Sequence, residues 1–442
     1  MKNLSNRGKL LIAFALIVVI AVAAIFAGNL NRKDEGPAPL TYPIGVTLSL
    51  RLNEQGVNDL LPRNADLADE SFRKTLSAVS ALVNNATVRI TLDSSVFRTD
   101  LRLKDQDILY FAMKMAQDAI RIKTDILPDD AVIVMTAEDL AAAGSMPAFP
   151  EVTAEDMKAA REAMEEFAKS LRIHLKEKCG DEEKGSWDFE GKVFTSRRPV
   201  SLTMKELMVL VLNDYRDMLQ SEKLAAYYTK ADINPAEEMG RYIEAVESIP
   251  DDQLPAMTMY LSESGDDIYS AIDLDSKTDT AHIDCGIVGS NIAAHGTVTG
   301  SADAKIDLKA DARGYNYDFT ASIDAPSGSS ASGERMTVDL KAAGTTEKNT
   351  GEAKGFVSVS VSGSELFAAD YTIGKGEPVS VDFDAENQRV ITLDTLNNLN
   401  RTAEGRQLSQ ELTSGALRIF QRISAAMPDE VNQLITLMTL LN

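Results

Sequence analysis

Apolar residues form an unbroken run from Leu10 to Ala27, and the rest of the chain mixes apolar with polar positions. A helix rises about 1.5 Å per residue, so the run covers roughly 27 Å, close to the hydrocarbon thickness of a bilayer. The pattern therefore predicts a single-pass transmembrane signal-anchor over residues 1–28. A cleaved secretory signal is the alternative, because Ala21-Val22-Ala23 has the small residues of a cleavage site. In both cases the body of the protein is exported.

The charges beside this run indicate its orientation. Lys2, Arg7 and Lys9 precede it without an acidic residue, whereas the basic residues that follow it are balanced by acidic ones. We therefore expect a protein of the cell membrane with a cytoplasmic N-terminus and an extracytoplasmic body. Residues 29–43 contain three prolines and a mixture of charges, which predicts an extended linker.

Between residues 44 and 150 the spacing of the apolar residues changes twice. From Val46 to Leu52 they alternate with polar residues, which predicts a half-buried strand. Apolar residues from Phe72 to Val83 then recur at helical spacing. Alternation returns across an Asp93-Ser94-Ser95 turn, and further strands are expected over residues 108–115, 120–126 and 131–135. The sequence thus predicts an N-terminal sheet with one helix over residues 44–150.

Helix-start signals dominate residues 151–255. A Thr-x-x-Asp sequence begins at Thr153 and a Thr-x-x-Glu sequence at Thr203, and both are typical of capping boxes. Pro235 suits the first position of a third helix. A strand is expected over residues 192–202. We predict that this segment is mainly helical.

Alternation is sustained from Met257 to Phe383, with Gly-, Ser- and Asp-rich turns between short strands. This spacing predicts an antiparallel meander with one apolar and one polar face, whose last strand contains Val379, Val381 and Phe383. Two amphipathic helices over residues 401–427 and 428–441 are expected to cover the apolar face. The fold class predicted for the body is therefore α+β, with antiparallel β-meander sheets packed on amphipathic helices. Residues 256–442 form its last domain.

Composition and charge narrow the classes of ligand. The chain has 442 residues, of which 44% are hydrophobic, enough for a sizeable core. Its formal net charge of −22 repels nucleic acid and anionic lipid headgroups, so neither is expected as a direct ligand. Cys179 and Cys285 are too few for a disulfide framework, but in an oxidising exterior they would suffice for one bridge. Free thiols are the alternative.

The order of the expected elements resembles that of known proteins. The resemblance rests on the alternating strands from Met257 to Phe383 and on the helices from Thr402 onward. An N-terminal anchor, a linker, hairpins and a long meander resemble uncharacterised bacterial membrane-anchored extracytoplasmic proteins. The last part is similar to the lipoprotein-carrier fold, in which a curved antiparallel sheet wraps helices and leaves an apolar cavity. This resemblance implies a hydrophobic ligand between sheet and helices.

Several residue groups suggest chemistry, and each has a simpler explanation. Ser71 and Lys74 have the Ser-x-x-Lys spacing of penicillin-interacting enzymes, but the accompanying Lys-Thr-Gly is absent and the segment fits an ordinary amphipathic helix. Other groups would suit zinc, calcium or a ligand groove, although their spacing also fits strand surfaces and packing. They are His282, Cys285 and His295 for zinc; Asp273, Asp275 and Asp279, and Asp382, Asp384 and Glu386, for calcium; and Tyr315, Tyr317 and Phe319 for a groove.

We therefore expect no catalytic, cofactor-binding or metal-binding residues. The favoured function is a non-catalytic, membrane-tethered extracytoplasmic protein that binds a lipid-like or other hydrophobic ligand between sheet and helices. An envelope structural or protein-interaction module is the first alternative. A hydrolase of envelope polymers that acts through paired carboxylates is the second.

Overall fold

The computed structural model describes residues 40, 42–60, 70–116, 119–136, 138–139, 154–231, 234–276, 278–300, 303–313, 315–326, 335–384 and 388–440. The expected transmembrane segment and most of the linker lie outside these residues. No helix within the described ranges is both long and apolar enough to cross a bilayer. The folded part divides into two compact units, here called the central unit (residues 152–343) and the terminal unit (residues 36–151 with 344–442).

The central unit combines helices with an antiparallel sheet. Neighbouring strands pair in chain order from β7 to β14. β15 (Arg335–Thr346) continues from this unit into the terminal unit. The other elements are α5 (Ala154–Glu177), β7 (Glu183–Phe189), β8 (Lys192–Val200), α6 (Met204–Leu219), α7 (Glu222–Ala231), α8 (Pro235–Glu247), the 3-10 helix η2 (Asp251–Gln253), β9 (Ala256–Ser264), β10 (Asp267–Asp275), β11 (Thr280–Val288), β12 (Asn291–Thr299), β13 (Ala304–Arg313) and β14 (Asn316–Pro326).

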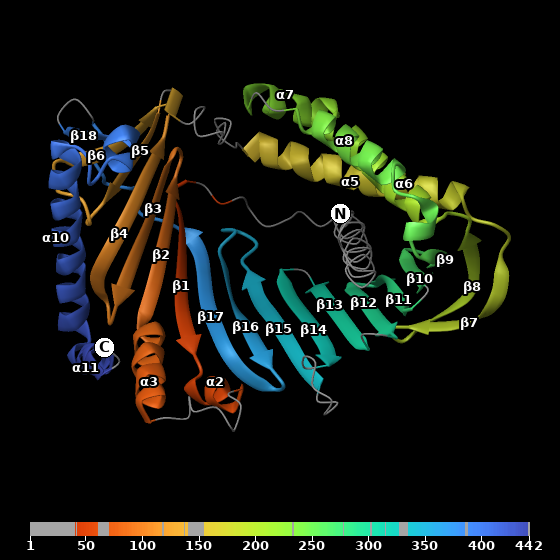
Figure 1. The fold of residues 1–442 in the computed structure, drawn as a ribbon. Coiled ribbons are helices and arrows are strands. Elements are labelled where there is room, and N and C mark those ends of the chain that lie inside the picture. Colours follow the sequence, from red (N-terminus) through yellow and green to blue (C-terminus); the bar gives the residue numbers. More distant parts are fainter. Residues whose placement is uncertain are drawn as a thin grey trace. The chain divides into compact units, whose positions relative to one another are not determined.

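Helices α5 to α8 cover one face of this sheet (Figure 1). Leu171 of α5 and Leu207 of α6 are buried in the same cluster as Ile272 and Ile283, which β10 and β11 direct toward the helices. The predicted capping box at the start of α6 is confirmed, since Thr203 Oγ1 accepts a hydrogen bond from the backbone of Glu206 and the Glu206 side chain accepts one in return. The middle helices therefore provide the cover that the strands of residues 256–313 require.

The hairpin of β7 and β8 packs against the opposite face of the sheet. Phe194 is 1% exposed, and Phe189 stacks on Tyr269 with 5.1 Å between the ring centroids. Arg197 of β8 lies over the ring of Tyr260, 3.7 Å from its centroid. Both faces of this part of the sheet are thus covered by the chain itself.

The terminal unit is a second antiparallel arrangement. Its strands lie in the order β16, β17, β1, β2, β3, β4, β5, β6 and β18, and β18 is parallel to β6. β1 therefore joins strands that are far apart in sequence. The elements are β1 (Ile44–Leu52), α2 (Glu54–Leu60), α3 (Glu70–Asn84), β2 (Ala86–Asp93), β3 (Val96–Leu103), β4 (Gln106–Met115), β5 (Ala119–Thr124), β6 (Ala131–Thr136), β16 (Ala353–Val361), β17 (Ser364–Lys375), β18 (Arg389–Thr392), α9 (Leu393–Asn397), α10 (Ala403–Ala426) and α11 (Pro428–Leu440).

The C-terminal helices pack within the terminal unit. α10 runs along β4 and α11 contacts α3 (Figure 1). Ile108 of β4 and Met427, which follows α10, are both 0% exposed and belong to the same buried cluster. The sequence predicted that these helices would cover the strands of residues 256–383, whereas these contacts are with β4 and α3, from the first third of the chain. The α+β class with a large antiparallel sheet is confirmed.

Candidate functional site

The terminal unit contains a groove of about 780 Å³ above the polar face of its sheet. Most of its lining residues belong to β16, β17, β1, β2 and β3, which form its floor, and Thr345 of β15 and Asp107 of β4 lie at its two sides. Side chains along these strands alternate between two faces, as the period of a strand requires. Thr47 and Arg89 therefore share one face, and Val46 and Ile90, which also line the groove, alternate with them. The lining is thus mainly polar, with a few apolar residues.

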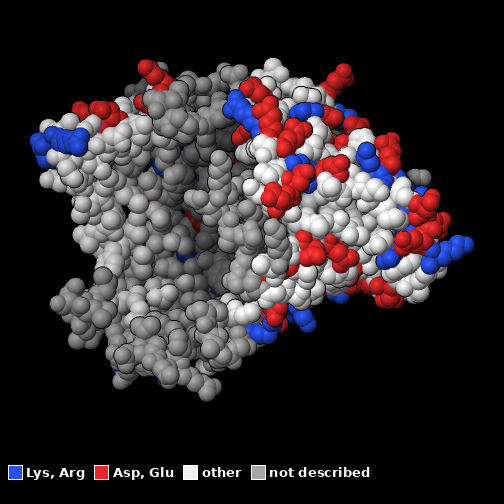
Figure 2. Space-filling view, turned by 45° about the vertical axis from the view of Figure 1, so that its right-hand side comes forward, with Lys and Arg blue, Asp and Glu red and all other residues white. Residues whose placement is uncertain are grey.

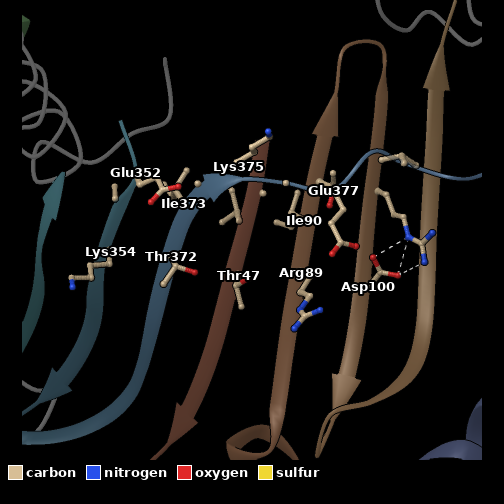
Figure 3. A pocket seen from close by; sticks show the side chains of 18 of the residues that line it. Thr47, Arg89, Ile90, Asp100, Glu352, Lys354, Thr372, Ile373, Lys375 and Glu377 are labelled. Atoms are coloured by element: carbon tan, nitrogen blue, oxygen red, sulfur yellow. Dashed lines mark hydrogen bonds and ion pairs between the residues drawn. The ribbon is translucent and has the colours of Figure 1, made fainter. Parts of the chain in front are cut away.

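The pairing register aligns four polar residues across the floor. Arg89 lies opposite Thr47, Thr47 opposite Thr372, and Thr372 opposite Lys354. Directly opposed residues in antiparallel strands lie on the same face, so their side chains stand in one row across β2, β1, β17 and β16. Figure 3 shows this row, which we call the transverse row.

One end of the groove is closed by the chain that follows β17. This crossing segment, residues 376–384, passes over the start of β1, where the backbone NH of Gly376 donates to the carbonyl of Pro43. A Cβ on Gly45 would lie 3.0 Å from the Cα of Gly376, so the two backbones approach too closely for side chains. Further along, the NH of Val379 donates to Asp93 Oδ2.

The crossing segment corrects one prediction. We expected Val379, Val381 and Phe383 to form the last strand of the meander, but the described residues 376–384 contain no strand. The segment runs over the ends of strands, so some of its side chains face the protein and others face solvent. Phe383 is buried and Ser380 is exposed, which gives the alternation without strand pairing. Alternation alone does not distinguish such a crossing from a paired strand.

Ion pairs occupy the β3 side of the groove. The Arg98 guanidinium donates to both oxygens of Asp100 at 2.6–2.9 Å and lies over the ring of Tyr110. The hydrogen bond with Asp100 outweighs burial and raises the pKa of Arg98. Arg102 pairs with Asp107 at 2.8 Å. These cations are therefore already neutralised by partners within the chain.

The cations of the transverse row are different. Within the described residues, the side chains of Arg89 and Lys354 have no hydrogen bond or ion pair, and both residues are exposed. The charged residues that line the groove are five basic and five acidic, namely Arg89, Arg98, Arg102, Lys354 and Lys375, and Asp100, Asp107, Glu347, Glu352 and Glu377. The groove is thus formally neutral in a chain of net charge −22, and three of its cations, Arg89, Lys354 and Lys375, have no side-chain partner among the described residues.

The residues considered for zinc lie on two faces of one sheet in the central unit. Cys285 follows His282 by three residues on β11, so the two side chains point to opposite faces of the sheet. Cys285 is buried and lies opposite Ala294. His282 and Asp284 point to the other face, as does His295, which lies opposite Asp284. The period of two therefore separates the thiol from both imidazoles. In the described residues no group of three or more His, Cys, Asp or Glu side chains is arranged to hold a metal ion.

The two histidines are held by carboxylates. His282 lies 2.6 Å from Asp273 and 2.9 Å from Asp284. Burial lowers the pKa of His282, but the hydrogen bond with Asp273 and the charge of Asp284 outweigh this effect, so its pKa is raised. Asp284 also accepts a hydrogen bond from Tyr269 Oη at 2.6 Å. This network joins β10 to β11.

A second network fixes the β7–β8 hairpin to the sheet. His295 lies between Asp307, at 2.8 Å, and Glu190 at the tip of the hairpin, at 2.7 Å. Lys309 Nζ lies 2.9 Å from Glu190. Burial opposes the ionisation of Glu190, but the hydrogen bonds with Lys309 and His295 outweigh it and lower its pKa. We name the residues Asp273, His282, Asp284, His295, Asp307, Glu190 and Lys309 the histidine network.

Both cysteines are free thiols. Cys179 is half-buried, and its Sγ lies 3.4 Å from the carbonyl of Leu175. Cys285 is 6% exposed, and burial raises the pKa of its thiol to about 12. The bridge considered from the sequence is not formed in this structure.

The remaining candidate residues do not converge. Asp273 belongs to the histidine network, whereas Asp279 is buried in the turn after β10, where Thr278 donates to it. Asp382 accepts the NH of Asp384, which lowers the pKa of Asp382, and Glu386 lies outside the described residues. Lys74 is exposed on α3, and the side chain of Ser71 lies outside the described part.

The aromatic residues considered for a groove belong to the central unit. Tyr317 and Phe319 are half-buried on β14, and Tyr315 lies in the turn before it. Burial raises the pKa of Tyr317. None of the three lines the groove of the terminal unit.

Charge is mixed over the visible described surface. Figure 2 shows acidic and basic side chains interspersed there. Such a surface suits solubility, in keeping with the net charge of −22.

Comparison with known proteins identifies no family. No protein-family model matches the chain, and no curated protein matches it. Among solved structures, intact Ap-TbpB with its N and C lobes is 9% identical over 78% of this chain and 80% of that chain, with a TM-score of 0.13. OccAB4 of Acinetobacter baumannii is 8% identical over 65% of this chain and 73% of that chain, with a TM-score of 0.12. Similarity at this level supports no conclusion about fold or function.

Proposed function

We propose that this protein is a non-catalytic, membrane-tethered binding protein whose ligand occupies the groove of the terminal unit. The observation that carries the proposal is the transverse row, in which the side chains of Arg89 and Lys354 have no partner among the described residues although acidic residues also line the groove. Charge-assisted hydrogen bonds are the stronger ones in proteins, so unpaired cations beside two threonine hydroxyls favour a polar ligand with negative charge.

The polar lining distinguishes this ligand from the hydrophobic one suggested by the sequence. The clusters between helices and strands consist of closely packed side chains, such as Leu171, Leu274 and Ile283 at 1% exposure. Arg89, Lys354 and Thr372, by contrast, are exposed within the groove. Open access and a polar floor support reversible binding of a solute from the exterior.

A filled groove would test this function. In Thr47→Trp an indole would occupy the centre of the floor, while Thr297→Trp would place the same side chain at an exposed position on β12 of the central unit. The full chain in mild detergent would be screened calorimetrically against sugar acids, dicarboxylates and phosphate esters. We expect at least one class to bind wild type and Thr297→Trp and to lose affinity about tenfold or more for Thr47→Trp. Equal binding by all three proteins would refute the groove as the ligand site.

The tether rests on the apolar run from Leu10 to Ala27 and on the basic residues before it. Deletion of residues 10–27 is expected to release the protein from the membrane fraction. Protease added to intact spheroplasts is expected to digest the body of the full chain. A body protected from the protease would contradict the proposed orientation.

A further inference from the structure

The ends of the transverse row are too far apart for one small anion. Three strand spacings separate Arg89 from Lys354, and strands lie about 4.8 Å apart, so their Cα atoms are about 14 Å apart. A single carboxylate or phosphate therefore contacts one end of the row. A ligand that uses both cations must be linear and must carry at least two anionic groups.

The surroundings of the row limit the charge density of that ligand. Asp100 lies opposite Arg89 on β3, and Glu352 precedes Lys354 by two residues on the same face. Glu377 lines the groove from the crossing segment. Arg98 already neutralises Asp100, but Glu352 and Glu377 would repel a polymer with a charge on every unit, whereas hydroxyl groups between widely spaced anions would donate hydrogen bonds to them.

Thr47 and Thr372 complete this pattern at the centre of the row. Each hydroxyl both donates and accepts, which suits a ligand rich in hydroxyl groups. Lys354 and Arg89 at the two ends are exposed, so a ligand chain can continue beyond the row. Figure 3 shows the four side chains in line across the strands.

Building on the groove function proposed above, we infer that the groove binds a linear acidic glycan that lies across the strands. Its acid groups pair with Arg89 and Lys354, and its hydroxyls bond to the threonines and carboxylates between and beside them. A single-stranded nucleic acid or polyphosphate chain fits less well, because its closely spaced charges meet Glu352 and Glu377.

The test uses partially methyl-esterified oligogalacturonates of increasing length, from one sugar to eight, with the full chain in detergent. We expect affinity to rise with length until the oligomer spans the row. For the long oligomer, Arg89→Gln and Lys354→Gln are each expected to lower affinity about tenfold. For the shortest ligands only one of these variants should weaken binding. Lys305→Gln, which removes an exposed cation from the central unit, should change neither.

The outcomes separate this inference from the groove function. The acidic-glycan inference would be overturned if a single sugar acid bound as tightly as the octamer, or if polyphosphate of equal length bound more tightly. If that binding were still weakened by Thr47→Trp, the groove would remain the ligand site. Failure of every oligogalacturonate to bind would also overturn the inference. Glycan binding that was insensitive to Thr47→Trp would overturn both.

Discussion

The polar sheet faces of the two units contain the same kinds of residue but differ in pairing. In the central unit the histidine network connects its imidazoles, carboxylates and lysine with one another and fixes the β7–β8 hairpin. In the terminal unit Arg89 and Lys354 lack partners within the described residues and lie in a groove. Charged residues therefore support the fold where they satisfy each other, and they are available for a ligand where they do not.

The largest expected loss of folding stability comes from a substitution on the covered face of the central unit. Phe194→Ala would remove a ring that is 1% exposed, and substitutions of this kind cost about 3–5 kcal/mol of folding free energy. Its neighbour Val193 is 50% exposed, so Val193→Ala should change stability by less than about 0.5 kcal/mol. Chemical denaturation would measure both. A small effect of Phe194→Ala would mean that the hairpin does not contribute to the core.

The crossing segment offers a test in the terminal unit. A Cβ on Gly376 would lie 2.9 Å from the backbone nitrogen of Gly45, so Gly376→Ala should cost about 1–3 kcal/mol through overpacking. Gly240 on α8 has open space around it, and Gly240→Ala should instead stabilise by about 0.5–1 kcal/mol through helix propensity. Hydrogen exchange at the Gly376 amide should accelerate in the first variant. Unchanged exchange would contradict the close approach.

Two substitutions that each remove a charge compare how much the polar sheet faces of the two units contribute to stability. Glu190→Ala would deprive His295 and Lys309 of a shared partner and should cost about 1 kcal/mol. Arg89→Gln should leave the free energy of unfolding within about 0.5 kcal/mol of wild type, because the side chain is exposed and has no ion pair or hydrogen bond with the described residues. Thermal unfolding of both variants would check the contrast. A comparable loss in Arg89→Gln would show that Arg89 has a structural role.

The smallest expected effect is a dependence of stability on pH. The pKa of His282 in the folded state is raised above its ordinary value of 6.5, so its contribution is complete below about pH 6.5. That contribution is lost as the pH rises through the folded-state pKa. His282→Asn should therefore flatten the decline in stability above pH 6.5. Because the side chain is 48% exposed, solvent screening keeps the effect small.

Local patterns predicted much of the fold. Alternation from Val46 to Leu52 located β1, and the Thr203 capping signal located the start of α6. The Asp93-Ser94-Ser95 turn also joins β2 to β3, with Ser94 at φ 52°. These features succeeded because neighbouring residues determine them.

The groove depends on pairing between distant residues, which local patterns do not contain. Thr47 meets Thr372 only because β1 pairs with β17, and no spacing near Thr47 specifies this partner. The polar positions Arg89 and Lys354 are visible in the sequence as ordinary solvent-facing residues. His282 and Cys285, considered together for zinc, are three residues apart, so they face opposite sides once both lie on β11.

The position of β1 also has a consequence for biosynthesis. Arg51 on β1 pairs with Asp370 on β17, a separation of 319 residues. At about 5–20 residues per second, a ribosome would need between about fifteen seconds and a minute to supply the second strand after the first has emerged. During this interval the nascent chain presents one side of β1 without its final neighbour. Such unpaired backbone attracts other chains, so protection by a chaperone would be most valuable at this stage.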